Sequence, residues 1–521
     1  MSDRVNLDPE TSSAEVISEA EARFERWRKV CGAVAAPVGF LVTWLLTAGV
    51  LPPAGQNLAA VLVTVAVLWM TEPIPLPVTA IVGPMLCIVL GVADAKTVLA
   101  PFSDPIVFLF IGSFILARAM MLHGLDRRLA VAFLSVRWVG GHPLRVLAAM
   151  GLVTAMVSMW VSNTATAAMM LPVGLGLLQT LHQVRAPDGR GSLRDWPYAT
   201  GLMLMIAYAA SIGGIGTPVG TPPNLITIGL IHSLAGVKLS FFRWMSLAVP
   251  MLAVMWPVLF LLLRRLHPVG EISADTADGL RAYLQGQRAS LRSWTAGQFN
   301  TLAAFAVALT LWVAPGILSL VVDKGHPLAE FLEHQVPESM AALIAASLLF
   351  VLPVNLRPGR FTISWNEAVQ IDWGTILLFG SGLSLGKLMF DTGVATALGH
   401  GIVGLTGAHS LWTLTAAAVA MGIFISETTS NTSATNMLVP VVIAIAQAAG
   451  VDPVPPALGA CFGANYGFML PVSVPPNAIV YSSGLVPITK MMRAGLLFDL
   501  LGFFMVLGCL RVLCPLLGLS Q

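Results

Sequence analysis

Residues 162–173 read SNTATAAMMLPV and residues 430–441 read SNTSATNMLVPV, so six of the twelve aligned positions are identical. A serine stands four residues upstream of each stretch, at Ser158 and Ser426, which gives the pattern S-x-x-x-S-N-T twice. A polar pattern of this length that recurs in each half of the chain indicates that the two halves are related.

A second repeated pair follows the first in the same order. Residues 217–226 read TPVGTPPNLI and residues 470–479 read LPVSVPPNAI, with six of ten positions identical. Proline lacks the backbone N–H that continues a helix, and the surrounding glycines are conformationally permissive. The two segments therefore predict one broken helix in each half, over about 200–232 and 457–485.

The composition surrounding these motifs is that of a membrane protein. Of 521 residues, 56% are hydrophobic and 10% are charged, whereas soluble domains carry about 25% charged residues. A spanning helix needs roughly 20 apolar residues, so the chain has room for ten or more spans. The net charge of +2 gives no reason to expect nucleic acid binding, and the five cysteines form no CxxC pair.

Polar segments divide the chain into four predicted regions. Residues 1–29 end in a basic cluster directly before the first apolar run, which predicts a cytoplasmic N-terminal tail by the positive-inside bias. The Arg-containing stretch 265–298 is expected to be a cytoplasmic linker. It separates two membrane halves, 30–264 and 299–521.

Two apolar runs do not look like single crossings. The run 145–181 has arginines on both flanks and a polar middle, so it enters and leaves on the cytoplasmic side, as two crossings or as one re-entrant hairpin. Its short arms favour the hairpin. No Lys or Arg lies between Asp391 and Lys490, so the run 411–448 should enter from the outside. Opposite orientation in the two halves is the mark of an inverted repeat.

The residue types in the motifs limit the ligand. The four motifs contain no Arg, Lys, Asp or His, and their only charged residue is Glu427. As an acid inside the membrane Glu427 is a functional candidate, but we favour a structural role over ligand binding, either stabilising a half-helix end or pairing with a basic residue. Hydroxyl, amide and carbonyl oxygens suit Na⁺, while hydroxyl, amide and backbone N–H groups can bind carboxylates. Because opposite charges about 4 Å apart attract by ~4 kcal/mol at an effective dielectric near 20, co-bound Na⁺ could compensate a dianion.

Other functional classes are poorly supported. Residues Gly380 to Lys387 resemble a phosphate loop, but five residues rather than four separate the glycines, and Leu388 replaces the required Ser or Thr. ATP binding is therefore not expected, and transport would be secondary. The motif hydroxyls have no adjacent His or Lys, and the nine histidines show no HExxH spacing, so an enzyme is not expected.

At these motifs the sequence resembles the divalent anion–sodium symporter family, over nearly the whole chain from about residue 30 onward. The resemblance implies an all-α integral membrane fold with eleven spanning helices, two re-entrant hairpins and two broken helices. It also implies a homodimer in which a transport domain slides against a scaffold domain, as an elevator. Family members move C4-dicarboxylates, citrate or sulfate.

The resemblance also implies the site residues. One sodium site would use Ser158, Ser162, Asn163 and the carbonyl of Gly220, and the other Ser426, Thr429, Asn431 and the carbonyl of Ser473. At Thr429 and Ser473 other members commonly carry a small residue such as alanine. The substrate-binding set would be Asn163, Thr164, Thr221, Pro222, Ser430, Asn431, Thr432 and Pro475.

The sequence thus predicts a Na⁺-coupled importer of succinate, malate or fumarate in a bacterial inner or plasma membrane. Two alternatives stay open. One is a sodium-independent dicarboxylate exchanger, although an exchanger would be expected to place a fixed positive charge near the anion. The other is a sodium-coupled transporter of sulfate or another divalent oxyanion.

Overall fold

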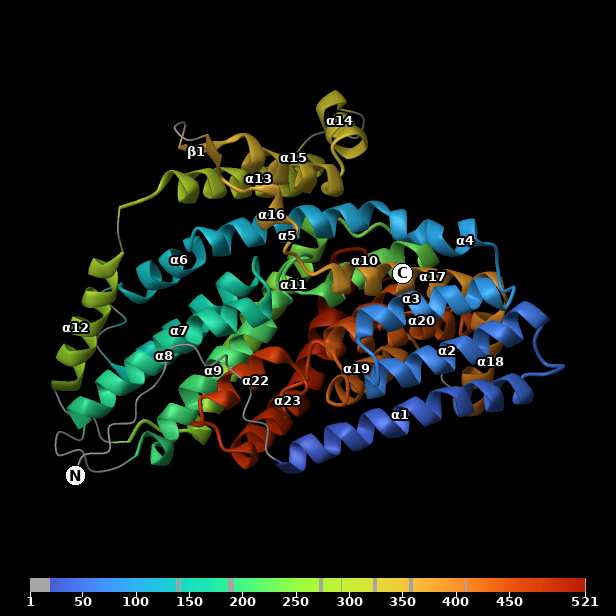
Figure 1. Ribbon diagram of the computed structural model, residues 1–521, viewed down its shortest axis with the longest axis horizontal. Helices are drawn as coiled ribbons and strands as arrows, with labels where there is room; N and C mark the ends of the chain where they lie inside the picture. Colours follow the sequence, from blue (N-terminus) through green and yellow to red (C-terminus); the bar gives the residue numbers. More distant parts are fainter. Residues whose placement is uncertain are drawn as a thin grey trace.

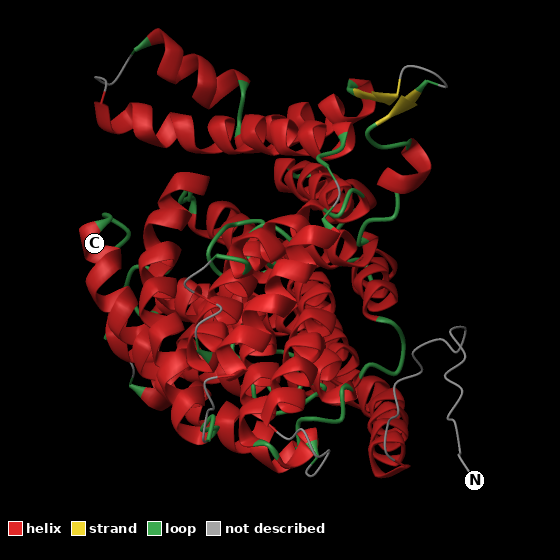
Figure 2. Ribbon diagram, turned by 90° about the vertical axis from the view of Figure 1, so that its left-hand side faces the viewer, coloured by secondary structure: helices red, strands yellow, loops and turns green. Residues whose placement is uncertain are grey.

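The computed structural model describes residues 19–136, 139, 142–185, 192–270, 275–291, 293–321, 326–355, 359–407 and 410–520. Within these ranges the chain is almost entirely helical, which confirms the predicted α fold (Figure 2). The described sheet is one short antiparallel ribbon, β1 (Pro353–Asn355) and β2 (Arg360–Phe361), which the sequence did not predict.

Eight helical segments are long and apolar enough to cross a membrane in the described part of the chain. They comprise α1 (Glu19–Leu46), α2 (Pro53–Thr71), α4 (Ala95–Leu99) continuing through η1 (Ala100–Ser103) into α5 (Pro105–Leu122), α8 (Asn163–Arg185), α11 (Phe241–Leu266), α13 (Ala296–Val321), α17 (Trp373–Asp391) and α23 (Ile488–Leu516). Shorter apolar helices lie between them, so the chain is a multi-span bundle.

One group of helices packs without using the repeated motifs. Helix α3 (Leu76–Val89) packs on α17, and α5 packs on α15 (Glu338–Val351), which also contacts α13. Small residues allow close approach here, because a Cβ at Gly112 of α5 would lie 2.7 Å from the backbone of Ala342 in α15. Helices α13, α15 and the short α14 (Pro327–Gln335) lie at the top of Figure 1.

The repeated motifs lie in a second group of helices, where each helix pair is interrupted. The runs 145–181 and 411–448 form α7 (Pro143–Ser158) with α8, and α19 (Leu411–Ser426) with α20 (Asn431–Ala448). The predicted broken helices form α9 (Pro197–Gly214) with α10 (Pro222–Ala235), and α21 (Val454–Ala464) with α22 (Pro475–Ser482). Prolines occupy the first positions of α10 and α22, where a missing N–H costs least.

Two helices extend into segments predicted as polar tail and linker. Helix α1 begins at Glu19, well before residue 30. Helix α12 (Asp275–Ser290) lies in the predicted linker 265–298 and packs on α8 and on α6 (Leu125–Leu134). Its Leu284 is 5% exposed, so one apolar face is enough to hold a helix that is too polar to span a membrane. The remaining short helices are η3 (Leu193–Asp195), α16 (Trp365–Ala368) and α18 (Val394–Thr406).

Glycines set the distance between each hairpin and its broken helix. A Cβ at Gly213 of α9 would lie 2.4 Å from the carbonyl oxygen of Ala155 in α7, and a Cβ at Gly463 of α21 would lie 2.4 Å from that of Val419 in α19. Backbone atoms cannot yield as a flexible side chain can. The two helix crossings therefore depend on the absence of a side chain.

We predict that Gly463→Val lowers the stability of the folded protein, because its Cβ would collide with the backbone of Val419. Overpacking of this kind costs about 1–3 kcal/mol. Thermal unfolding of the purified protein in detergent measures the effect. Gly508→Val in α23 is the matched control, since nothing lies within 4 Å of a Cβ at that position. Equal melting of the two variants would contradict the prediction.

Candidate ion and substrate site

The tip between α7 and α8 is tied to the break between α9 and α10. The Ser158 hydroxyl oxygen lies 2.8 Å from Asn163 Oδ1 and 2.7 Å from the carbonyl oxygen of Ala210. The Thr217 hydroxyl donates to the Met159 carbonyl at 2.5 Å. Two of the residues predicted for the first sodium site, Ser158 and Asn163, are therefore in direct contact.

The tip between α19 and α20 repeats this arrangement. The Ser426 hydroxyl oxygen lies 2.7 Å from Asn431 Oδ1 and 2.8 Å from the carbonyl oxygen of Ala464. In both halves the serine ends the first helix of the hairpin and the asparagine begins the second. The sequence repeat thus extends to matching hydrogen-bond geometry.

An asparagine from each P-P-N segment fills the break in its helix. The Asn224 side chain donates to the carbonyls of Gly214 at 2.9 Å and Thr217 at 2.7 Å. The Asn477 side chain donates to the carbonyls of Gly467 and Leu470, each at 3.0 Å. Both asparagines are fully buried. The sequence contained the signal for them, a duplicated Asn after two prolines, but it did not show which carbonyls they would bind.

The two halves meet at these breaks. The Asn465 side chain donates to Asn224 Oδ1 at 3.4 Å. Helix α10 also packs on α20 and α21, while α22 packs on α8 and α9. The four repeated motifs, which lie far apart in the sequence, are thereby gathered into one region of the second helix group.

Helix ends give this region its electrostatic character. Helices α8, α10, α20 and α22 begin here, and α7, α9, α19 and α21 end here. A helix N-terminus has unpaired N–H groups and partial positive charge, whereas a C-terminus has unpaired carbonyls and partial negative charge. The region can therefore attract an anion at some points and a cation at others without a basic side chain.

The predicted site residues differ in exposure. Ser158, Gly220, Thr221, Ser426, Thr429 and Ser473 are buried, Asn163, Pro222, Ser430, Asn431 and Thr432 are half-buried, and Ser162, Thr164 and Pro475 are exposed. The Ser162 and Ser430 hydroxyls accept hydrogen bonds from the backbone N–H groups of Ala165 and Ser433, so each serine caps its helix. The first tip is more open than the second.

Two predicted sodium ligands use their hydroxyls elsewhere. The Thr429 hydroxyl donates to the carbonyl of Trp69 in α2 at 2.9 Å, and the Ser473 hydroxyl donates to Glu427 Oε2 at 2.7 Å. The other carboxylate oxygen of Glu427 accepts from the Met469 N–H at 2.9 Å. Glu427 therefore braces the break between α21 and α22, in line with the stabilising role expected for it.

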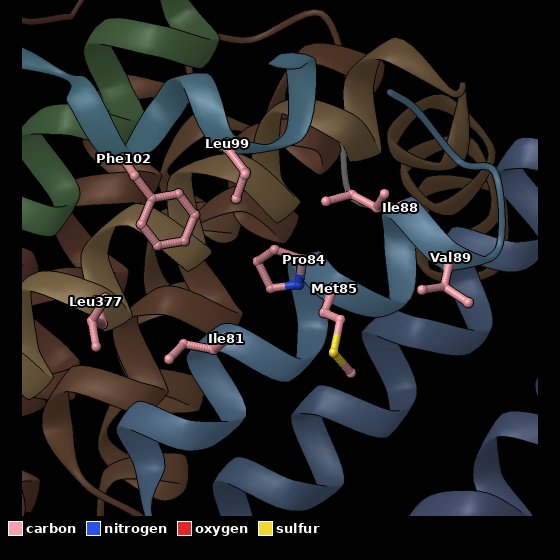
Figure 3. A pocket seen from close by; sticks show the side chains of 8 residues that line it. All are labelled: Ile81, Pro84, Met85, Ile88, Val89, Leu99, Phe102 and Leu377. Atoms are coloured by element: carbon pink, nitrogen blue, oxygen red, sulfur yellow. The ribbon is translucent and has the colours of Figure 1, made fainter. Parts of the chain in front are cut away.

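A separate pocket of about 400 Å³ opens between α3, η1 and α17 (Figure 3). Apolar residues line it: Ile81, Pro84, Met85, Ile88, Val89, Leu99, Phe102 and Leu377. It contains none of the predicted site residues and has no lining side chain that could hydrogen-bond an anion. This pocket is therefore not a site for a carboxylate or sulfate ligand.

Comparison with known families agrees with the motifs. The family model described as the sodium:sulfate symporter transmembrane region matches residues 26–519, nearly the whole chain. The chain belongs to the sodium:sulfate symporter family. This symporter is a multi-pass membrane protein and a sodium-coupled anion transporter rather than an enzyme.

Individual relatives cover most of the symporter. An uncharacterised transporter of Haemophilus influenzae is 32% identical over 88% of this chain and 92% of its own. The sodium-dependent dicarboxylate transporter SdcS of Staphylococcus saprophyticus is 30% identical over 94% of this chain and 92% of its own.

Two solved structures resemble the symporter in fold alone. The Alcanivorax borkumensis YdaH transporter superposes with a TM-score of 0.51 at 13% identity, over 81% of this chain and 86% of that chain. The Neisseria gonorrhoeae MtrF structure superposes with a TM-score of 0.53 at 13% identity, over 82% of this chain and 84% of that chain. Both support the multi-span helical architecture.

We predict that Asn224→Ala and Asn477→Ala each destabilise the symporter, because each leaves two buried backbone carbonyls without their donor. An unsatisfied buried polar group costs roughly 1–3 kcal/mol. The melting temperature in detergent should fall for both variants. Asn366→Ala is the control, since Asn366 is exposed. Melting temperatures equal to that of Asn366→Ala would show that the asparagines do not brace the breaks.

Proposed function

We propose that this symporter imports C4-dicarboxylates such as succinate, malate or fumarate, driven by Na⁺. The observation that carries the proposal is the duplicated Ser–Asn contact at helix ends in a region whose motifs contain no basic side chain. A dianion bound there would need positive charge from co-bound ions. The name of the Staphylococcus relative, a sodium-dependent dicarboxylate transporter, supports the same substrate class.

Each sodium ion would bind where helices end. The first site would use Ser158, Ser162, Asn163 and the carbonyl of Gly220, beside the C-terminal ends of α7 and α9. The second would use Ser426, Thr429, Asn431 and the carbonyl of Ser473, beside those of α19 and α21. Since the hydroxyls of Thr429 and Ser473 donate to other groups, their carbonyl oxygens are the better sodium ligands.

The dicarboxylate would bind between the two tips. Asn163 and Thr164 would contact one carboxylate at the N-terminus of α8, and Asn431 and Thr432 the other at that of α20. Thr221, Pro222, Ser430 and Pro475 would shape the pocket. Because both sodium sites share an asparagine with the substrate site, sodium binding would organise the groups that the anion needs.

The proposed movement is of the elevator type in a homodimer. The helix group α2, α3, α5, α13, α15 and α17 would form the scaffold. The hairpins and broken helices, with α11 and α23, would form the transport domain as an inverted repeat. Helices within each group pack on one another, which supports this division. We place the protein in the bacterial inner membrane, with its N-terminus in the cytoplasm by the positive-inside bias.

We predict that Asn163→Ala and Asn431→Ala each abolish Na⁺-driven uptake of labelled succinate into proteoliposomes, since each removes a side chain shared by a sodium site and the substrate site. The exposed Asn366→Ala variant should transport like the unmodified protein. Normal sodium-dependent uptake by either tip variant would contradict the assignment of these residues.

Sulfate is the second candidate substrate, because the matching family model is described as a sodium:sulfate symporter. We predict that an excess of unlabelled succinate suppresses labelled succinate uptake while equal sulfate leaves it nearly unchanged. In the proposed binding mode each carboxylate of succinate contacts one tip, whereas sulfate has no second carboxylate to do so. Stronger competition by sulfate would reverse the substrate assignment.

A further inference from the structure

A second acidic side chain lies buried behind the second tip. Asp499 in α23 is 4% exposed, and neither of its carboxylate oxygens has a hydrogen-bond partner. Gly495, one turn earlier, brings the helix onto the break between α21 and α22, because a Cβ there would lie 2.3 Å from the Phe468 carbonyl oxygen. The aspartate is thus held against the segment that Glu427 braces.

The groups beside Asp499 do not neutralise it. It interacts with the Glu427 carboxyl and lies near the Phe468 N–H, but neither makes a hydrogen bond of good geometry with it. In the described part of the chain, the charged group that acts on Asp499 is this second acid, with no Lys, Arg or His beside it. A buried carboxyl group, Asp499, and a half-buried one, Glu427, therefore interact without a positive partner, an arrangement that is costly in an apolar interior.

A neutral oxygen donor lies close to the pair. Tyr466, in the break between α21 and α22, is fully buried, interacts electrostatically with Asp499, and has a hydroxyl without a hydrogen-bond partner. Tyr208, which also interacts with both acids, instead donates its hydroxyl to the Phe468 carbonyl at 2.8 Å. The oxygens of Asp499 and Tyr466 that have no protein partner can both serve as ligands for a cation.

The acid pair belongs to the second half alone. Met159 occupies the position in the first half that corresponds to Glu427, since each precedes the asparagine that begins the second helix of its hairpin by four residues. Helix α11, which follows the first broken helix as α23 follows the second, contains no Asp or Glu. The duplicated Ser–Asn contacts form without an acid pair in the first half, so the pair is not needed to build a tip.

We propose that Glu427 and Asp499, with the Tyr466 hydroxyl, hold a third sodium ion behind the second tip. Carboxylate and hydroxyl oxygens are hard ligands that suit a small hard cation. The Ser473 hydroxyl binds Glu427 while the Ser473 carbonyl is assigned to the second sodium site, so one residue joins the two ions. This inference rests on the proposed function, because it adds an ion to that transport cycle.

The coupling ratio tests the inference. In proteoliposomes, the sodium and succinate gradients are set in opposition, and the membrane potential at which net succinate flux is zero is measured. This potential gives the number of sodium ions moved per succinate. Asp499→Asn keeps the shape of the side chain and removes its charge, so the ratio should fall by one sodium ion. Asp391→Asn, an exposed acid at the end of α17, should keep the ratio of the unmodified protein.

The outcomes separate the two proposals. Absence of sodium-driven uptake by the unmodified protein would refute the proposed function itself. Normal uptake with the same ratio in Asp499→Asn would overturn only the third site. Loss of a coupled proton instead of a sodium ion, measured as succinate-driven alkalinisation, would also overturn it, because the pair would then hold a proton.

A second variant decides the matter if Asp499→Asn does not fold. Tyr466→Phe removes only the unpartnered hydroxyl, so the folded protein should remain intact. In Tyr466→Phe the sodium concentration for half-maximal succinate uptake should rise several-fold. Tyr208→Phe is the control, because it removes a hydroxyl that is already bonded to the Phe468 carbonyl, and it should raise that sodium concentration less. Unchanged sodium activation in Tyr466→Phe would count against the site.

Discussion

Eight helix ends inside an apolar bundle are the constraint on which the rest of this structure depends. Each end leaves backbone N–H or carbonyl groups without a helical partner, and lipid cannot supply one. The chain supplies partners of its own, since Asn224 and Asn477 donate to carbonyls at the breaks. Ser426 contacts the carbonyl of Ala464 at the end of α21, and Ser158 contacts that of Ala210, four residues before the end of α9. Only such a braced break can persist among the spanning helices.

These hydrogen-bonded helix ends also explain how the proposed binding region could hold an anion without basic residues. A fixed Arg or Lys beside the tips would attract an anion at all times. Helix N-termini offer weaker, partial positive charge, so under the proposed function a dianion would depend on ions that bind with it. The proposed need for co-bound sodium thus follows from the absence of Arg and Lys in the four motifs as well as from the oxygen ligands that they contain.

The sequence was sufficient for the positions of the breaks. Proline pairs before Asn224 and Asn477 and the duplicated S-N-T tips located all four interruptions, because local chemistry decides where a helix stops. It was not sufficient for contacts between distant segments. The bond from Thr429 to Trp69, 360 residues apart, depends on how helices pack, and no periodicity in the sequence encodes it.

Two further features could not be predicted from the sequence, for different reasons. The sequence predicted a linker over 265–298 but not the helix α12 within it, because the polar composition of α12 conceals one packed face. Asp499 lies in a long apolar run, where a single acid changes the mean hydropathy little, although an ionisable residue inside a membrane span is a functional candidate by default. Only the approach of α23 to the break at Phe468 shows that this acid faces another.

Equilibrium binding of labelled succinate to the purified protein, in Na⁺ and in K⁺ at equal ionic strength, tests the central claim most directly. If alkali ions supply the positive charge that the motifs lack, succinate affinity should rise with Na⁺ by about 5–150-fold, and Na⁺ affinity should rise with succinate by the same factor. Equal succinate affinity in the two salts would contradict the account.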